Sequence, residues 1–227
     1  MKTTWIKQEG HQSVLLFFNG WGMDEKIALY LSNNSSDGCP YDILHCNDYR
    51  DTILPEEVHN QLKNYEQRIV IAWSFGVWVA NQVGLSNVTK AIALNGTLSP
   101  INTFKGIAPP IFQATLDNYD EHNRERFMRR ICGGNRGYKA FEPMAPERTV
   151  LDQKQELIAL QKQVLSGYRN DRSWCYQHVI IGGKDLIFTD TAQQRAWPDT
   201  RQTLINDMPH LPFYEFNNWQ EILSCLD

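Results

Sequence analysis

A serine between two small residues has the clearest chemical potential in this chain. The sequence Ala72-Trp73-Ser74-Phe75-Gly76 follows a β-branched run and precedes a helical pattern. Small residues two positions before and after a serine permit a tight strand-to-helix turn, which presents the hydroxyl above a sheet as a nucleophile. A serine at the start of a helix also has a simpler role as an N-cap. Both interpretations of Ser74 are open on this motif alone.

A nucleophilic serine requires a base, and the base requires an acid that orients it. In α/β proteins with this type of turn, the acid precedes the histidine, and both follow the serine. Asp185 ends a glycine-rich turn after a strand-like segment, and His210 lies in a proline-flanked loop before the last helical pattern. Asp190 is a rival for the acid. We therefore predict a catalytic triad of Ser74, His210 and Asp185.

Acyl transfer also requires two N–H donors directed at the developing oxyanion. Phe75 directly follows the candidate nucleophile, and Asn19-Gly20-Trp21-Gly22 follows the first long apolar segment. We expect the main-chain N–H groups of Trp21 and Phe75 to form the oxyanion hole. Their side chains, with Trp73 and Trp78, are candidates for the wall of an apolar substrate tunnel.

The elements around these motifs alternate between strand and helix patterns. We predict strands at residues 13–18, 41–46, 68–73, 88–94, 175–181 and 203–205, with 3–7 as an extra edge strand. Helices are expected at 24–31, 55–65, 75–83 and 219–226. This alternation predicts an α/β-hydrolase fold, which is a mostly parallel sheet with helices on both faces.

Residues 111–168 interrupt this alternation. They contain helical patterns at 111–119, 121–131 and 153–165 and no convincing strand. We expect one domain over residues 1–227, with a helical lid inserted at about 111–168. Such a lid would lie over the carboxyl ends of the strands, where open α/β sheets bind ligands.

Composition limits the class of protein. The chain has 227 residues, a net charge of −4 and 21% charged residues. These values favour a globular protein and argue against nucleic acid or a membrane surface as a partner. The N-terminus lacks a signal-peptide pattern, and the five cysteines lack metal-ligand spacing. We expect a cytoplasmic monomer with reduced, buried thiols, no metal ion and no cofactor.

Four motifs together resemble a known family of esterases. The chain is similar to the carboxylesterases that cleave pimeloyl-acyl carrier protein methyl ester in biotin synthesis. The motifs that carry this similarity are Asn19–Asp24, Ala72–Gly76, Gly182-x-x-Asp185 and His210-x-Pro212-Phe213. The Gly-Trp-Gly loop and the Trp-Ser-x-Gly turn are shared with the BioH type. The short N-terminus, the compact length and Asn-Gly-Trp-Gly-Met-Asp are closer to the BioG type. Asn19 replaces the usual histidine, and Ala72 replaces a glycine.

The resemblance implies a reaction, a mechanism and a partner. The enzyme would remove the methyl group from a pimeloyl chain that is still attached to its acyl carrier protein. Cleavage would proceed through a Ser74 acyl-enzyme, with His210 as base and then acid and Asp185 orienting the histidine. Methanol would leave first, and water would complete the second step.

The lid segment has the opposite charge to the rest of the chain. Residues 124–148 carry a net charge of +4, from seven basic and three acidic residues (Arg124, Arg126, Arg129, Arg130, Arg136, Lys139 and Arg148; Glu125, Glu142 and Glu147). Because acyl carrier proteins are acidic, such a segment suits electrostatic steering. We expect Arg126, Arg129 and Arg130 to contribute to substrate binding. A solvated helix face paired with its own acids is an equal alternative.

Other functions share the same motifs. A carboxylesterase for small esters and a thioesterase that cleaves the chain from its carrier would use the same three residues. A non-catalytic binding protein with a hydrolase fold is a further alternative, but the complete set of Ser74, Asp185 and His210 argues against it.

Overall fold

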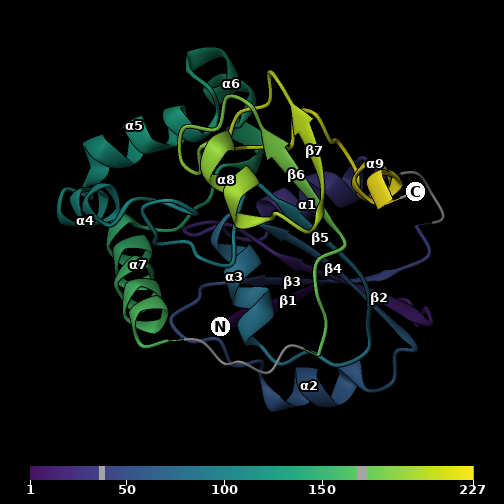
Figure 1. Cartoon of the computed structure of the whole chain (residues 1–227). Coiled ribbons are helices and arrows are strands. Elements are labelled where there is room, and N and C mark those ends of the chain that lie inside the picture. Colours follow the sequence, from purple (N-terminus) through teal and green to yellow (C-terminus); the bar gives the residue numbers. More distant parts are fainter. Residues whose placement is uncertain (36–38, 168–172, 227) are drawn as a thin grey trace.

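A computed structural model describes residues 1–35, 39–167 and 173–226. Its centre is a seven-stranded sheet in the order β1-β3-β2-β4-β5-β6-β7 (Figure 1). The strands are β1 (Lys2–Lys7), β2 (Ser13–Phe18), β3 (Asp42–Asn47), β4 (Gln67–Trp73), β5 (Val88–Leu94), β6 (His178–Gly182) and β7 (Arg201–Ile205). Among these strands, only β1 pairs antiparallel with its neighbour, and it lies at one edge of the sheet. The predicted α/β-hydrolase architecture and its edge strand are confirmed.

Helices follow most strands of this sheet. They are α1 (Lys26–Asn33), α2 (Glu56–Leu62), α3 (Phe75–Gln82), α4 (Pro109–Asp117), α5 (Glu121–Ile131), α6 (Asn135–Ala140), α7 (Val150–Leu165), α8 (Asp190–Ala196) and α9 (Trp219–Leu223), with short 3₁₀ turns at Glu142–Met144 and Ser224–Leu226. Since parallel strands require crossover connections, these helices cover the sheet on both sides.

The sheet separates two apolar cores. Side chains alternate along a strand, so Leu16 and Phe18 of β2 pack on one face, and Leu15 and Phe17 pack on the other. The first face is covered by α2 and α3, and the second by α1 and α9. Strands buried on both faces read as continuous apolar runs, which is why most strand positions could be predicted from the sequence.

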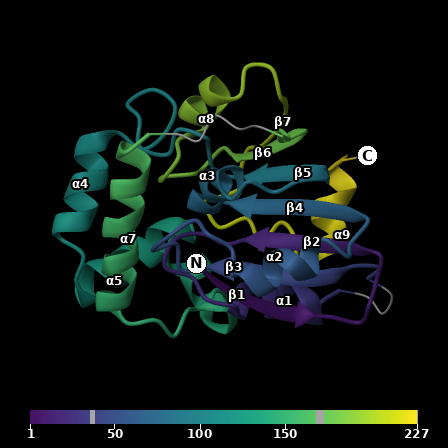
Figure 2. The same ribbon diagram turned by 90° about the horizontal axis from the view of Figure 1, so that it is seen from below.

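The insertion between β5 and β6 is helical, as expected. Helices α4, α5 and α7 group together beyond one end of the sheet (Figures 1 and 2). Asp120 caps α5 by accepting from the N–H of Asn123, and Thr149 caps α7 by accepting from the N–H of Asp152. Helix α5 starts at the predicted residue, whereas α7 starts at Val150, three residues before the predicted start at Gln153. The expected end of the lid at Tyr168 lies outside the described residues.

Several local predictions differ from the structure. The strand predicted at 175–181 pairs only from His178, because Tyr176 turns into the core and donates its hydroxyl to the Val77 carbonyl. Helices α6 and α8 were not predicted, since α6 buries no side chain and α8 is short and mostly polar.

The thiols also differ in part from expectation. Cys39, Cys46 and Cys132 are buried and unbridged, as expected, but Cys175 is exposed and Cys225 is half-buried. Across the described ranges, no helix combines the length and the apolar character that crossing a bilayer demands.

Candidate active site

Ser74 lies in the turn between β4 and α3, at the carboxyl edge of the sheet. Its backbone has a φ of 58° and a ψ of −125°, a conformation that non-glycine residues rarely adopt. An N-cap residue has extended backbone angles and accepts a hydrogen bond with its side chain. The Ser74 side chain makes no such cap bond. The N-cap interpretation therefore does not describe this serine.

The residues around Ser74 are small because the backbone approaches closely. A Cβ at Gly76 would lie 2.3 Å from the Phe18 carbonyl oxygen and 2.5 Å from that of Asn19. A Cβ at Gly96 would lie 2.4 Å from the Ser74 carbonyl oxygen. The turn thus packs directly against the end of β2, which continues into the loop that carries Trp21.

The structure brings Ser74, His210 and Asp185 into one hydrogen-bonded chain. The Ser74 Oγ lies 2.9 Å from His210 Nε2, and His210 Nδ1 lies 2.8 Å from Asp185 Oδ2. Because a carboxylate only accepts, Nδ1–H donates to Asp185, and Nε2 accepts from the serine hydroxyl. All three residues are buried. This arrangement can move a proton from the serine to the histidine.

Both oxygens of the Asp185 carboxylate accept hydrogen bonds. Its Oδ1 accepts from the N–H groups of Ile187 and Phe188, and its Oδ2 also accepts from the Gln193 amide at 3.1 Å. The rival acid Asp190 instead starts α8 and accepts from its neighbour Thr191. The structure therefore places Asp185, and not Asp190, against His210.

The histidine loop is fixed through its backbone. The His210 carbonyl accepts from the Trp73 indole at 2.8 Å and from the Asn95 amide at 2.9 Å. Its ring stacks on Phe188 with an interplanar angle of 16°. These contacts come from three segments of the chain, so the imidazole orientation does not depend on Asp185 alone.

The loop after β2 is fixed by Asn19, the residue that replaces the usual histidine of the family that the motifs resemble. The Asn19 amide donates to the Asp24 carbonyl and to His45 Nε2, while its oxygen accepts from the Gly20 N–H. Burial lowers the pKa of His45 to about 3, so the ring is neutral and can accept this bond. Asn19 thus fixes the loop without charge.

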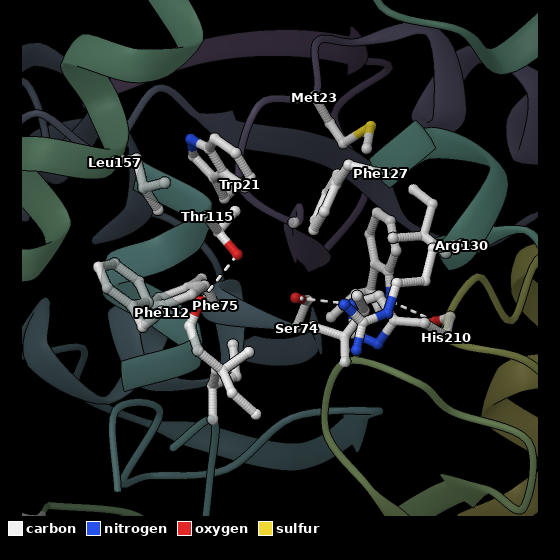
Figure 3. A pocket seen from close by; sticks show the side chains of 16 residues that line it. Trp21, Met23, Ser74, Phe75, Phe112, Thr115, Phe127, Arg130, Leu157 and His210 are labelled. Atoms are coloured by element: carbon white, nitrogen blue, oxygen red, sulfur yellow. Dashed lines mark hydrogen bonds between the residues drawn. The ribbon is translucent and has the colours of Figure 1, made fainter. Parts of the chain in front are cut away.

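Ser74 and His210 line an apolar cavity (Figure 3). Trp21, Phe75 and Trp73 line it as predicted, but Trp78, which lies on α3, packs in the core instead. Most of the remaining wall comes from the lid (Ile111, Phe112, Thr115, Phe127, Arg130, Ile131 and Leu157) and from Ile107 just before it. Arg130 is the one cationic side chain among the lining residues.

Comparison with known proteins identifies the family. The family model for Pimeloyl-ACP methyl esterase BioG matches residues 1–222 of the 227-residue chain. The chain belongs to the BioG family. The crystal structure of BioG from Haemophilus influenzae is 30% identical, with a TM-score of 0.85 over 97% of this chain and 98% of that one.

Two curated relatives extend this result. A malonyl-[acyl-carrier protein] O-methyltransferase from Bacteroides fragilis is 38% identical over 190 residues, which are 82% of this chain. The chain spans only 36% of the length of that protein. An uncharacterised Haemophilus influenzae protein is 32% identical over 98% of this chain and 99% of its own length. A Nitrososphaera carboxylesterase structure, 14% identical with a TM-score of 0.60, shares the fold. Family and fold together indicate an enzyme of the α/β-hydrolase type.

The basic lid of this BioG-family chain divides into two groups. Arg126, Arg130, Arg136 and Lys139 are exposed. Arg124 and Arg148 instead make hydrogen bonds inside the protein. Arg129 was expected to bind substrate, but it does not line the cavity. It pairs with Glu125 at 2.6 Å and lies over Tyr138, because the i,i+4 spacing on α5 favours that pair.

The roles of several residues of this site could not be found from the sequence. Gln193, which binds Asp185, lies on the unpredicted helix α8 and has no local pattern that indicates its role. Asn95 follows β5 and has a positive φ of 44°, a signal that is visible only in the backbone. No group of three or more His, Cys, Asp or Glu side chains suited to a metal ion occurs in the part of the chain that the structure describes.

Proposed function

We propose that this protein hydrolyses the methyl ester of a pimeloyl chain carried by an acyl carrier protein. The observation that carries the proposal is the hydrogen-bonded chain from Ser74 through His210 to Asp185 at the wall of an apolar cavity. The match to the BioG family model supports this choice of ester.

The first half of the reaction forms an acyl-enzyme. The Ser74 Oγ attacks the ester carbonyl carbon while His210 Nε2 takes the hydroxyl proton. The developing oxyanion receives hydrogen bonds from the N–H groups of Trp21 and Phe75. Phe75 is the first residue of α3, so its N–H has no partner within the helix. His210 then gives its proton to the leaving methoxide, and methanol departs.

The second half releases the acid. Water takes the place of methanol, His210 removes one of its protons, and the hydroxide attacks the acyl carbon. Collapse of the second tetrahedral species breaks the bond to Ser74 Oγ, which recovers the proton from His210. The products are a free distal carboxylate and the original enzyme. Throughout both halves, Asp185 keeps the Nδ1 proton in place.

The cavity suits the end of a chain rather than a whole chain. Its volume at Ser74 is about 40 Å³, whereas one water needs roughly 10–15 Å³ on the same scale. A methyl ester group fits such a space, and a pimeloyl chain does not. A groove between α4 and α5 adjoins the cavity and shares Ile111, Phe127 and Arg130 with it. We place the methylene chain in this groove.

The exposed charges at the groove support a carrier-bound substrate. Arg126 and Arg130 both line the groove, one helical turn apart on α5. An acidic carrier protein that docks here would present its acyl chain directly to the cavity. The name of the Bacteroides relative also refers to an acyl carrier protein. Because this chain spans 36% of that relative, its methyltransferase activity is not transferred to this chain.

Genetic complementation tests the pathway. We expect this chain to restore biotin-independent growth to a bacterial strain that lacks its pimeloyl-carrier methyl ester esterase, and Ser74→Ala to abolish the rescue. Equal expression of both variants, checked by immunoblotting, is the control. Failure of the wild type to rescue growth would remove the pathway from the proposal and leave a carboxylesterase for other small esters, or a thioesterase, as the alternative.

A further inference from the structure

The main-chain N–H of Trp21 lies in the turn at residues 20–23, and the hydrogen bond that closes this turn is weak. The Met23 N–H reaches the Gly20 carbonyl at 3.4 Å, which is long for such a bond. Gly22 has a φ of 77°, as the third residue of a type II turn requires. Since a trans peptide is planar, the Trp21 N–H points opposite to the Gly20 carbonyl and out of the turn.

Helix α7 of the lid holds this turn from outside. The Gln153 amide donates to the Gly22 carbonyl at 2.7 Å, and Glu156 Oε2 accepts from the Gly22 N–H at 3.2 Å. The Trp21 indole N–H donates to the Gln153 carbonyl at 2.8 Å. The Glu156 contact fixes the orientation of the Trp21–Gly22 peptide, because flipping that peptide would direct a carbonyl at a carboxylate.

Both α7 side chains are fully buried and are themselves anchored. The Gln153 oxygen accepts from the Tyr119 hydroxyl at 3.0 Å and from Arg124 Nε at 2.9 Å. Glu156 Oε1 accepts from the Tyr49 N–H at 3.0 Å, and Arg148 binds Oε2 at 2.5 Å. A buried carboxylate and a buried amide with this many partners cannot shift without leaving polar groups unpaired.

We infer that Gln153 and Glu156 are positioning residues for the oxyanion hole, so that lid helix α7 sets the place of the Trp21 N–H relative to Ser74. This inference rests on the proposed hydrolytic function. It makes α7 a fixed part of the catalytic apparatus, whereas α4 and α5 line the groove. The alternative is that the two residues only stabilise the fold.

The test replaces each residue with the closest shape that loses the loop contact. Gln153→Glu keeps the acceptor for Tyr119 and Arg124 but cannot donate to Gly22. In Glu156→Gln, the amide keeps only one acceptor oxygen, whereas the Glu156 carboxylate accepts hydrogen bonds from three donors. We expect kcat on a p-nitrophenyl ester to fall about 10–100-fold, with KM changed less than about threefold, because a misplaced oxyanion donor acts in the transition state.

A transition-state analogue separates positioning from simple stability. A trifluoromethyl ketone adds to a serine nucleophile and forms an oxyanion, so its affinity should fall in parallel with kcat in both variants. Asp152→Asn is the matched control, since Asp152 lies on α7 and also pairs with Arg148 but has no contact with the loop. Its kcat should stay within about twofold of wild type. If Gln153→Glu does not fold, Gln153→Met removes the same donor without added charge.

The outcomes distinguish the inference from the proposed function. Folded Gln153 and Glu156 variants with wild-type kcat and inhibitor affinity would overturn the inference. Equal losses in Asp152→Asn would show a stability effect and would also overturn it. A wild type that cleaves neither the small ester nor the carrier-bound ester would overturn the proposed function instead.

Discussion

At the scale of single residues, the proposed reaction depends on the Ser74 Oγ as the attacking oxygen. Ser74 carries a positive φ and binds His210 across 136 residues of sequence. We expect wild-type protein to react with a fluorophosphonate probe and Ser74→Ala to show no labelling, because the probe bonds to an activated serine. Gel fluorescence or intact mass checks this. Labelling of Ser74→Ala at an equal rate would place the nucleophile elsewhere.

The choice of acid gives a second residue-scale prediction. We expect Asp185→Asn to lower kcat by about 10³–10⁴-fold, because an amide at this position favours the wrong imidazole tautomer. Asp190→Asn is the matched control, and its kcat should stay within about threefold of wild type, since Asp190 binds only Thr191 among the contacts that the structure records. Steady-state kinetics on a small ester measures both. The opposite ranking would contradict the site.

The order of Ser74, Asp185 and His210 could be predicted from the sequence because each follows a recognisable strand. The supporting residues could not. Gln193 and Asn95 bind parts of the site that lie 8 and 115 residues away in the chain. A buried amide has no sequence pattern that indicates its partner, so only the folded arrangement shows its role.

At the scale of elements, the contact between α3 and the end of β2 is tight. Gly76→Ala would place a methyl group 2.3 Å from the Phe18 carbonyl oxygen. We expect a loss of about 2–4 kcal/mol in the free energy of unfolding, since backbone must move to admit it. Gly84→Ala is the comparison, because Gly84 has a φ of 71° and open space around its Cα. It should lose only about 1–2 kcal/mol. Equal losses in urea denaturation would argue against the contact.

Strand β3 is tied to the turn before β2 by one buried carboxylate. Asp42 accepts from the Tyr65 hydroxyl at 2.7 Å and from the N–H groups of Glu9 and Gly10. Burial alone would raise the pKa of Asp42, but these hydrogen bonds outweigh it and lower the pKa below its usual value. The stabilising effect is therefore present above the unfolded pKa of about 3.9 and is lost as the pH falls through the lower folded pKa.

Asp42→Asn tests this pH dependence. At pH 7 we expect the variant to be about 1–3 kcal/mol less stable than the wild type, because a charge-assisted network is lost. The difference should shrink below about pH 4, as the wild-type carboxyl is protonated. Urea denaturation at several pH values measures it. A difference that does not change between pH 7 and pH 3 would contradict an ionised Asp42.

Element prediction succeeded where the pattern was local and failed where tertiary contacts decided it. Strand β5 and helix α5 were predicted with exact bounds, since the apolar run from Ala91 to Leu94 marks the end of β5 and the capping Asp120 marks the start of α5. Strand β6 starts at His178, three residues later than predicted, because Tyr176 has a partner on α3 that the sequence does not reveal.

At the scale of the whole molecule, charge is unevenly placed. The exposed Arg126 and Arg130 line the groove next to the cavity, in a chain whose net charge is −4. We expect Arg126→Glu to lower kcat/KM for a carrier-bound ester about tenfold, because the acidic carrier is steered by the basic groove. The kcat/KM for a small ester should stay within about twofold of the wild-type value. Rising salt should reduce the difference between the variants.

Lys63→Glu, at the end of α2, is the charge-matched control for this prediction. It makes the same charge change at a residue that lines neither the cavity nor the groove, and it should leave both substrates unaffected. Equal slowing by both variants would show that net charge, and not the groove, determines the rate. The sequence showed the charge inversion of the lid. It could not show that Arg124 and Arg148 make hydrogen bonds inside the protein, or that Arg129 pairs with Glu125 on the surface of α5.

The most direct test of the central claim is intact mass spectrometry of the substrate carrier. An acyl carrier protein loaded with pimeloyl methyl ester is incubated with wild type or Ser74→Ala. We expect wild type to lower the mass of the loaded carrier by one CH₂ group, which marks conversion of the methyl ester to the acid while the acyl chain stays attached. Ser74→Ala should leave the mass unchanged. Loss of the entire acyl chain would identify a thioesterase, and an unchanged mass with wild type would contradict the claim.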